Sequence, residues 1–367
     1  MATSAVITGW GFYVPPRVVT NADLGLLVDT TDAWIVDRTG IRERHVVDGD
    51  EATSGMAAKA ARIALERAGI AADQLDAVMV ATTTADHLVP TAACLVQEQL
   101  GARHAAVFDL GAACAGFVYG LAVAKGLVAS GAARRVLLVA AETISRFIDW
   151  SDRSTCVLFG DGAGAVVVEA SEGRGGIRGT VLRGDGTKKG ALWVEGGGSL
   201  QARIADVKDG QMYRLRMDGQ EVFKLAVPSM VRACEDVLAA EGLRLSDVTL
   251  LIPHQANLRI IEAVGKRLGI DRARVFVNIE RYGNTSAASI PIALCEAVEE
   301  GRVRPGDRIL MCAFGGGMTW GAALVEWSGA PVPGRRRGIV ARARALLSLA
   351  SRRSSSRSTS SGRAAPA

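Results

Sequence analysis

The amino-acid sequence predicts an α/β protein built from two similar halves, each a largely parallel sheet covered by helices. The chain has 367 residues, of which 49% are hydrophobic, so it can bury a large core and is too long for one small domain. Short apolar runs alternate with helical patterns, which is typical of sheets covered on both faces. The same succession of elements recurs after about 170 residues, which indicates an internal duplication.

The first half alternates helices with strands. A helical pattern over residues 54–67 leads through a short turn into the apolar run 77–81. A second apolar run, 106–108, leads to a turn of small residues around Cys114. A further helix follows this turn, and we then predict a strand over residues 135–139.

The second half repeats this order. Its helical pattern covers residues 231–240, and apolar runs follow over residues 250–252 and 274–276. A small-residue turn around Asn284 comes next, then a helix and the strand 308–311. Because Cys114 and Asn284 fall in corresponding turns, we expect them to lie close together where the two halves meet.

We predict halves at residues 1–172 and 173–330, followed by a basic Ser/Arg-rich tail at 331–367. The net charge of +5 is misleading, because the tail holds nine arginines from Arg335 onward and no acid, which leaves about −4 on the rest. We expect the tail to be a disordered, solvated extension, and the weaker alternative is contact with a membrane surface or nucleic acid. The stretch 171–210 is glycine-rich and carries no regular pattern.

Composition excludes several classes of protein. The six cysteines are scattered without a CxxC pair, which favours a reducing compartment and small core residues. The sequence shows no signal peptide and no run of 18 apolar residues, so we expect a cytoplasmic protein without integral membrane association. We expect no nucleic-acid partner.

Three residues form a candidate catalytic group. Cys114 lies between a strand and a helix, and the free N–H groups and dipole at a helix N-terminus favour a thiolate. His254 and Asn284 follow strands, at the sheet edge where open α/β sheets bind ligands. Each residue alone is more often structural, so the prediction depends on their conjunction.

Several longer motifs agree with this group. They are residues 32–42, the turn around Cys114, and residues 159–165, 253–257, 283–289 and 315–321. With these motifs, the chain from about Val6 to Trp327 resembles the β-ketoacyl-acyl-carrier-protein synthase III family. The resemblance implies a thiolase fold with five α-β-α-β-α layers, and a homodimer. It also implies an acyltransferase that condenses an acyl-CoA primer with malonyl-acyl-carrier protein, initiating fatty-acid or polyketide synthesis.

The resemblance assigns roles to the candidate residues. Cys114 is expected to take the acyl group from CoA, and His254 and Asn284 to donate hydrogen bonds to the malonyl thioester oxygen during decarboxylation. The backbone N–H groups of Cys114 and Gly316 are expected to form the oxyanion hole. No metal or separate cofactor is expected, because CoA thioesters are themselves the substrates.

A second set of residues is expected to bind the coenzyme. Trp34 and Arg38 lie four positions apart, and stacking and cation–π contact suit them to the adenine of CoA. By resemblance, Arg153 and Phe223 assist them.

Two further interactions are predicted. The basic side chains of Arg259, Lys266 and Arg267 are expected to receive an acidic carrier protein, and the alternative for the last two is an ordinary solvated helix face. Val89 stands where the family often has phenylalanine, at a position that reaches the partner subunit's primer pocket. The smaller side chain predicts room for primers longer or more branched than acetyl.

Three alternatives were weighed. A thiolase would use a second active-site cysteine, but Cys312 falls inside an apolar strand. A type III polyketide synthase would have a proline-containing loop where this chain has residues 315–320. A starter-unit or ester-forming relative of synthase III could retain the whole fold, so it stays open at this point.

Overall fold

The computed structural model describes residues 3–173, 175–196, 198–199 and 214–329. The tail predicted at 331–367 lies outside these residues, as does part of the irregular stretch 171–210. The division into halves at residues 172 and 173 stays a prediction.

The first sheet has five strands in the order β1-β7-β6-β4-β5. They are β1 (Ser4–Tyr13), β4 (Ala77–Ala81), β5 (Ala106–Leu110), β6 (Arg135–Glu142) and β7 (Gly162–Ser171). Strand β4 runs parallel to β5 and β6, and β7 runs antiparallel to β6 and β1. Every residue of β4 is buried, because helices cover both faces of the sheet.

The second sheet repeats this plan with four strands in the order β11-β12-β13-β8. They are β8 (Gly176–Gly184), β11 (Leu250–Pro253), β12 (Arg308–Gly315) and β13 (Thr319–Glu326). Strands β11 and β12 are parallel, and the pairs β12–β13 and β13–β8 are antiparallel, as for the corresponding strands of the first sheet. The strand predicted at 274–276 is reduced to a single bridge from Val275 to Leu251, in the place that β5 occupies beside β4.

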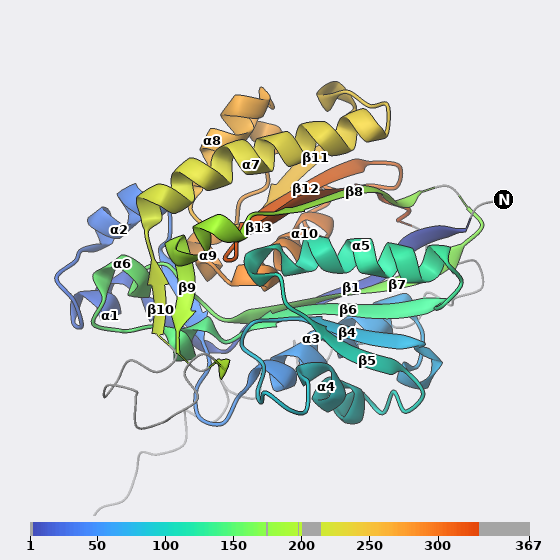
Figure 1. Cartoon of the computed structure of the whole chain (residues 1–367), viewed down its shortest axis with the longest axis horizontal. Coiled ribbons are helices and arrows are strands. Elements are labelled where there is room, and N and C mark those ends of the chain that lie inside the picture. The colour runs from blue at the N-terminus through green and yellow to red at the C-terminus, as the bar shows by residue number, and fades with distance from the viewer. Residues whose placement is uncertain (1–2, 174, 197, 200–213, 330–367) are drawn as a thin grey trace, which may run out of the picture. The chain divides into compact units, whose positions relative to one another are not determined.

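Six longer helices complete a five-layer stack (Figure 1). They are α3 (Thr53–Ala68), α4 (Ala92–Leu100), α5 (Gly116–Ala129), α7 (Gly219–Ala240), α8 (Leu258–Leu268) and α10 (Ser289–Glu299). Helices α3 and α4 cover the outer face of the first sheet, and α7 and α8 cover the second. Helices α5 and α10 pack between the sheets. The predicted α-β-α-β-α architecture is confirmed.

Alternation along the strands distributes the core among these layers. In β4, Met79 and Ala81 join the cluster between the sheets, whereas Val78 and Val80 pack on α3 and α4. Phe117 of α5 is completely buried in the middle cluster. Both faces of β4 are therefore apolar, as expected for a strand that helices cover on both sides.

One helix is longer than predicted. Helix α7 begins at Gly219 rather than at 231, and it contains Pro228. Proline removes a helical hydrogen bond and favours helix ends, so the pattern before it was missed. The Asp218 carboxylate caps the helix by accepting from the N–H groups of Gln220 and Glu221.

Shorter elements complete the described part of the chain. The short helices are α1 (Asn21–Gly25), α2 (Asp32–Thr39), α6 (Arg153–Cys156) and α9 (Ile279–Tyr282). The short strands are β2 (Arg17–Thr20) with β3 (Glu43–Val46), and β9 (Leu192–Glu195) with β10 (Arg214–Met217). Within the described ranges, no helix combines the length and the apolar character needed to cross a bilayer.

Candidate active site

A cavity of about 220 Å³ brings Cys114, His254 and Asn284 together at the ends of strands from both sheets. Its wall also includes apolar side chains from β9, β10, α7 and β12, among them Leu192, Met217, Val222 and Phe314. The three residues that the sequence singled out therefore share one mostly apolar chamber.

Cys114 and Asn284 lie in matching turns. Each turn is one short 3₁₀ helix, at Ala113–Ala115 and Ser286–Ala288, directly before α5 or α10. Ala113 and Ser286 both have left-handed backbone, with φ of 45° and 51°. This conformation costs a side-chain-bearing residue about 1–3 kcal/mol. The structural counterpart of Ser286 is thus Ala113, and Asn284 stands earlier in its turn than Cys114 does.

Burial of the Cys114 side chain opposes the thiolate form that the helix N-terminus is expected to favour. Cys114 is 7% exposed, and burial raises the pKa of its thiol to about 11. The charge of Glu142 raises this pKa further, and a hydrogen bond from Ser286 lowers it. Desolvation thus acts against the helix N-terminus, which favours the thiolate.

His254 is a neutral hydrogen-bonding group. It is 2% exposed, and burial lowers the pKa of its imidazole to about 3. Its Nδ1 lies 2.6 Å from Ser289 Oγ, which accepts the backbone N–H of Gln255 at 3.2 Å. The serine's own proton is then free for Nδ1, and in the tautomer that accepts it the ring proton is on Nε2. Sequence reasoning missed Ser289, although it ends the same 283–289 motif.

Asn284 is held with its amide nitrogen available. Its Oδ1 accepts the N–H of Ser286 at 2.9 Å, which leaves Nδ2 for the cavity. Its backbone N–H donates to Leu158 O at 2.8 Å, and its carbonyl accepts from Gly160 N at 3.1 Å. A side chain at Gly160 would place Cβ 2.4 Å from Tyr282 O. Glycine at this position of the 159–165 motif therefore lets the two backbone segments approach each other closely.

The β12–β13 turn packs against the amide of Cys114. A Cβ on Gly315 would lie 2.6 Å from Cys114 N, and Thr319 Oγ1 donates to Ala112 O at 2.8 Å. Gly316 is the next residue of this turn and lies against Leu192. The requirement for glycine at 315 was not predicted, although the run of three glycines at 315–317 was its signal.

The residues predicted to bind CoA gather at the cavity mouth. The Trp34 ring lies under two guanidinium groups, with Arg38 4.4 Å and Arg153 4.8 Å from the ring centroid. Arg38 and Phe223 line the cavity, and Phe223 is partly exposed. An indole ring with guanidinium groups beside it offers planar surfaces that suit stacking on a purine.

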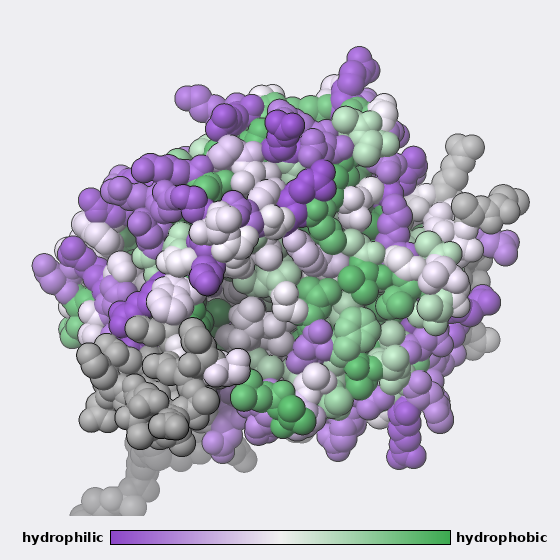
Figure 2. Space-filling model, in the orientation of Figure 1, coloured by the Kyte–Doolittle hydropathy of each residue, from purple (hydrophilic) through white to green (hydrophobic). Residues whose placement is uncertain are grey.

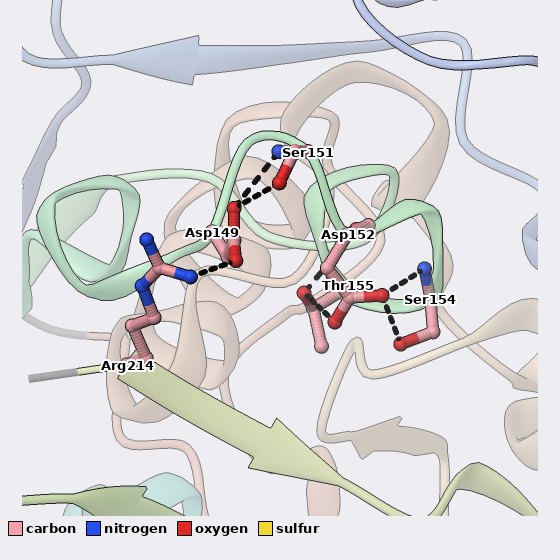
Figure 3. Close-up of polar contacts among 6 residues, drawn as sticks. All are labelled: Asp149, Ser151, Asp152, Ser154, Thr155 and Arg214. Carbon is pink, nitrogen blue, oxygen red and sulfur yellow. Dashed lines mark hydrogen bonds and ion pairs between the residues drawn. The ribbon is translucent and has the colours of Figure 1, made fainter. Parts of the chain in front are cut away.

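The loop that carries Arg153 is fixed by polar contacts (Figure 3). The Asp149 carboxylate forms an ion pair with Arg214 of β10 and accepts from Ser151 Oγ at 2.6 Å. Asp152 caps α6 by accepting from Ser154 N at 2.9 Å. Arg153 itself donates to Asp29 O at 2.7 Å, and its guanidinium lies 4.8 Å from the centroid of the Trp34 ring.

The other predicted residues lie farther from Cys114. Arg259 lines the cavity mouth and forms a 2.9 Å ion pair with Asp37, whereas Lys266 and Arg267 are exposed in the last turn of α8. Val89 is 87% exposed and is not part of the cavity wall. The single chain therefore does not bring Val89 to the site.

In the part of the chain that the structure describes, His, Cys, Asp and Glu form no group of three or more that could hold a metal ion.

Two further polar residues, which the sequence did not predict, belong to the surroundings of Cys114. Ser286 Oγ lies 3.4 Å from Cys114 Sγ, and Glu142 accepts from Ser286 at 3.2 Å.

Comparison with known proteins decides the family. Models of 3-oxoacyl-[acyl-carrier-protein] synthase III match residues 108–186, and models of its C-terminal part match residues 238–327. The chain is 54% identical over 329 residues to the β-ketoacyl-acyl-carrier-protein synthase III of Roseiflexus castenholzii, covering 89% of this chain and 99% of that protein. The chain belongs to the β-ketoacyl-acyl-carrier-protein synthase III family.

Solved synthase III structures agree with this assignment. The enzyme of Thermus thermophilus superposes with a TM-score of 0.83 at 49% identity, over 89% of this chain and 100% of that one. The priming β-ketosynthase of a polyketide pathway gives a TM-score of 0.84 at 39% identity, over 89% and 97%. The predicted family and fold are confirmed, and the ester-forming or starter-unit alternative is not favoured.

Proposed function

We propose that this synthase III condenses an acyl-CoA primer with malonyl-acyl-carrier protein to give 3-oxoacyl-acyl-carrier protein. The observation that carries the proposal is the meeting of Cys114, His254 and Asn284 in one buried cavity. A nucleophile facing two neutral hydrogen-bond donors suits acyl transfer followed by decarboxylation.

Cys114 is the proposed nucleophile of the first half-reaction. Its sulfur attacks the thioester carbonyl of acyl-CoA, and CoA leaves the acyl-enzyme. The N–H groups of Cys114 and Gly316 are the proposed oxyanion hole. The close packing of Gly315 on the Cys114 amide supports this, since it brings the two backbone segments together.

His254 and Asn284 are the proposed donors of the second half-reaction. Loss of CO₂ from the malonyl group places negative charge on its thioester oxygen. The Nε2–H of a neutral His254 and the Nδ2 group of Asn284 would then bind that charge more strongly than the ground-state carbonyl. The enolate carbon attacks the acyl-Cys114 thioester.

Substrates are proposed to enter at the mouth formed by α2, α6, α7 and α8. Trp34, Arg38, Arg153 and Phe223 would bind CoA, with the stacked guanidiniums in support. On α8, Arg259, Lys266 and Arg267 would steer an acidic carrier protein. No cofactor beyond these CoA and carrier-protein thioesters is proposed.

A homodimer in the cytoplasm is also proposed. Strand β5 is an edge of the first sheet, and it carries the half-buried apolar residues Val107, Phe108 and Leu110. Figure 2 shows apolar side chains gathered over α5. Leu88 and Val89 are two further exposed apolar residues, with exposures of 88% and 87%. All six cysteines are free, which suits a reducing compartment.

Mass spectrometry of Cys114 tests the proposal. The full chain is incubated with a mixture of acetyl-, isobutyryl- and octanoyl-CoA, and the acyl-enzyme is then given malonyl-acyl-carrier protein. We expect acylation of Cys114, its loss in Cys114→Ala, and release of CO₂ with a 3-oxoacyl product. Acylation that persists in Cys114→Ala would contradict the mechanism.

A further inference from the structure

Glu142 is a buried carboxylate that the proposed chemistry does not use. It ends β6 and is 0% exposed, and among the residues that the structure describes it accepts hydrogen bonds only from neutral donors. These donors are Thr84 Oγ1 at 2.7 Å, Thr83 Oγ1 at 3.1 Å, Thr83 N at 3.2 Å, Thr82 Oγ1 at 3.3 Å and Ser286 Oγ at 3.2 Å. Burying a carboxylate without a cation is costly, and burial raises the pKa of Glu142. Such a group can bind and release a proton.

Ser286 connects this carboxylate to the nucleophile. Its Oγ lies 3.4 Å from Cys114 Sγ and 3.2 Å from Glu142 Oε1. The left-handed backbone of Ser286, with φ of 51°, and the hydrogen bond from its N–H to Asn284 fix the residue in place. Ser286 has one hydroxyl proton, which is within reach of both Cys114 Sγ and Glu142 Oε1. When this proton is donated to Glu142, the oxygen can accept the thiol proton of Cys114.

His254 is poorly suited to take the thiol proton. Its Nδ1 contacts Ser289, and its pKa of about 3 makes it a weak base. Glu142 is also the charged group whose field reaches Cys114. The titratable groups around the nucleophile are thus Glu142 behind it and His254 across the cavity.

We propose that Glu142, acting through Ser286, accepts the thiol proton of Cys114 during acylation and stores it until condensation is complete. This inference rests on the proposed function and adds a proton route to it. Ser286 touches the reacting sulfur, whereas Glu142 acts through Ser286.

Acylation moves one proton and replaces the CoA thioester bond with a Cys114 thioester bond. The thiol proton moves to Ser286 Oγ as the serine proton moves to Glu142 Oε1, and the Cys114 sulfur bonds to the acyl carbon. The bond from that carbon to the CoA sulfur breaks, and CoA leaves as a thiolate that takes a proton from water. The acyl-enzyme then contains a protonated Glu142.

Condensation returns the proton. The malonyl carbon–carboxylate bond breaks to give CO₂, and the resulting enolate carbon bonds to the acyl carbon. The acyl–sulfur bond breaks, and its electron pair leaves Cys114 as a thiolate. The proton on Glu142 passes back through Ser286 to this sulfur, which restores the starting state without a proton from His254.

Single-turnover acylation by acetyl-CoA and butyryl-CoA, followed by intact-protein mass spectrometry from pH 6.5 to 10, tests the route. In Ser286→Ala and Glu142→Gln, we expect the rate at pH 7 to fall about 10²-fold, since general-base assistance is typically 10²–10⁴-fold. The deficit should shrink as pH rises, because hydroxide then removes the thiol proton directly. Alanine fits this turn, since Ala113 already adopts the same backbone.

A matched control and a second readout separate this role from a structural one. Thr143→Val removes a buried hydroxyl that contacts Thr53 rather than Glu142, and its acylation should stay within about threefold of wild type. Pre-acylated Glu142→Gln should still release CO₂ from malonyl-acyl-carrier protein at nearly the wild-type rate.

Three outcomes would overturn the proton store. A deficit below about threefold at pH 7 would do so, and so would a deficit that is equal at every pH. Either result leaves the proposed function standing if wild type is acylated and condenses. Absence of acylation in wild type itself would contradict the proposed function and the store together.

Discussion

At the scale of single residues, the hydroxyl of Ser289 is the hydrogen-bond partner of His254 Nδ1. The hydroxyl lies between Gln255 N–H and His254 Nδ1, on the first residue of α10. Its position is set by the helix, so the tautomer of the histidine is coupled to the backbone of the second half. When Ser289 donates to Nδ1, the substrate-facing nitrogen carries the ring proton and acts as a donor.

Ser289→Ala should therefore slow decarboxylation without slowing acylation. We expect the rate of CO₂ release to fall roughly tenfold, less than the 10²–10³-fold for loss of an oxyanion donor itself, because the imidazole remains. Acylation of Cys114 should be unchanged. Ser130→Ala, which removes an exposed hydroxyl after α5, is the control, and equal losses in both half-reactions would contradict the argument.

The buried His254 also predicts how stability depends on pH. Its folded pKa of about 3 lies below the ordinary 6.5, so between these values the unfolded chain binds a proton that the folded chain does not. The unfolding free energy should thus fall as pH drops below 6.5, by about 1.4 kcal/mol per pH unit from this group. Urea unfolding of wild type and His254→Gln should show wild type losing about 2 kcal/mol more by pH 5. Parallel pH curves would exclude this contribution.

At the scale of elements, the β12–β13 turn and the 3₁₀ turn of Cys114 form one packed unit. The Gly315 backbone meets the amide of Cys114 so closely that a Cβ would lie 2.6 Å from it. Thr319 joins the same two segments through Ala112 O. Movement of either turn therefore moves the nucleophile.

Gly315→Ala should displace the nucleophile. We expect a loss of about 1–3 kcal/mol in unfolding free energy from overpacking. The acylation rate should also fall more than tenfold, since misplaced reacting groups react slowly. Gly126→Ala on α5 is the matched control, because nothing lies within 4 Å of its Cβ. It should stabilise the helix by up to about 1 kcal/mol and leave acylation unchanged, and similar behaviour of both variants would contradict the prediction.

The sequence predicted these elements unevenly, for physical reasons. Apolar runs such as Ala77–Ala81 predicted their strands, because a strand buried on both faces has few sequence alternatives. The start of α7 was missed because Pro228 favours a helix end and only packing overrides it. Cys114, His254 and Asn284 were predicted from their turns. Glu142 and Ser289 were not, because their roles depend on contacts across 144 and 35 residues that no local pattern encodes.

At the scale of the whole molecule, a single chain does not place Val89, the residue expected to limit primer size, in its own Cys114 cavity. Val89 is 87% exposed and lies outside the wall of the Cys114 cavity. In addition, β5 forms an open sheet edge with half-buried apolar side chains. Both features fit a second copy that joins the sheet edge and receives Val89 in its own pocket.

Mixed dimers provide the test of this arrangement. One chain carries Val89→Phe and Cys114→Ala, its partner is wild type, and separate tags isolate the pair. If residue 89 acts across the interface, the single Cys114 meets the larger side chain. Its preference for acetyl-CoA over butyryl-CoA should then rise about tenfold or more, since one or two methylenes in an apolar pocket change rates by 10–200-fold. In the reciprocal pair, Val89→Phe lies on the chain with Cys114, and the wild-type primer range should persist. If the range of accepted primers narrowed in the reciprocal pair instead, residue 89 would act within its own chain. That result would contradict the arrangement inferred from the exposed Val89.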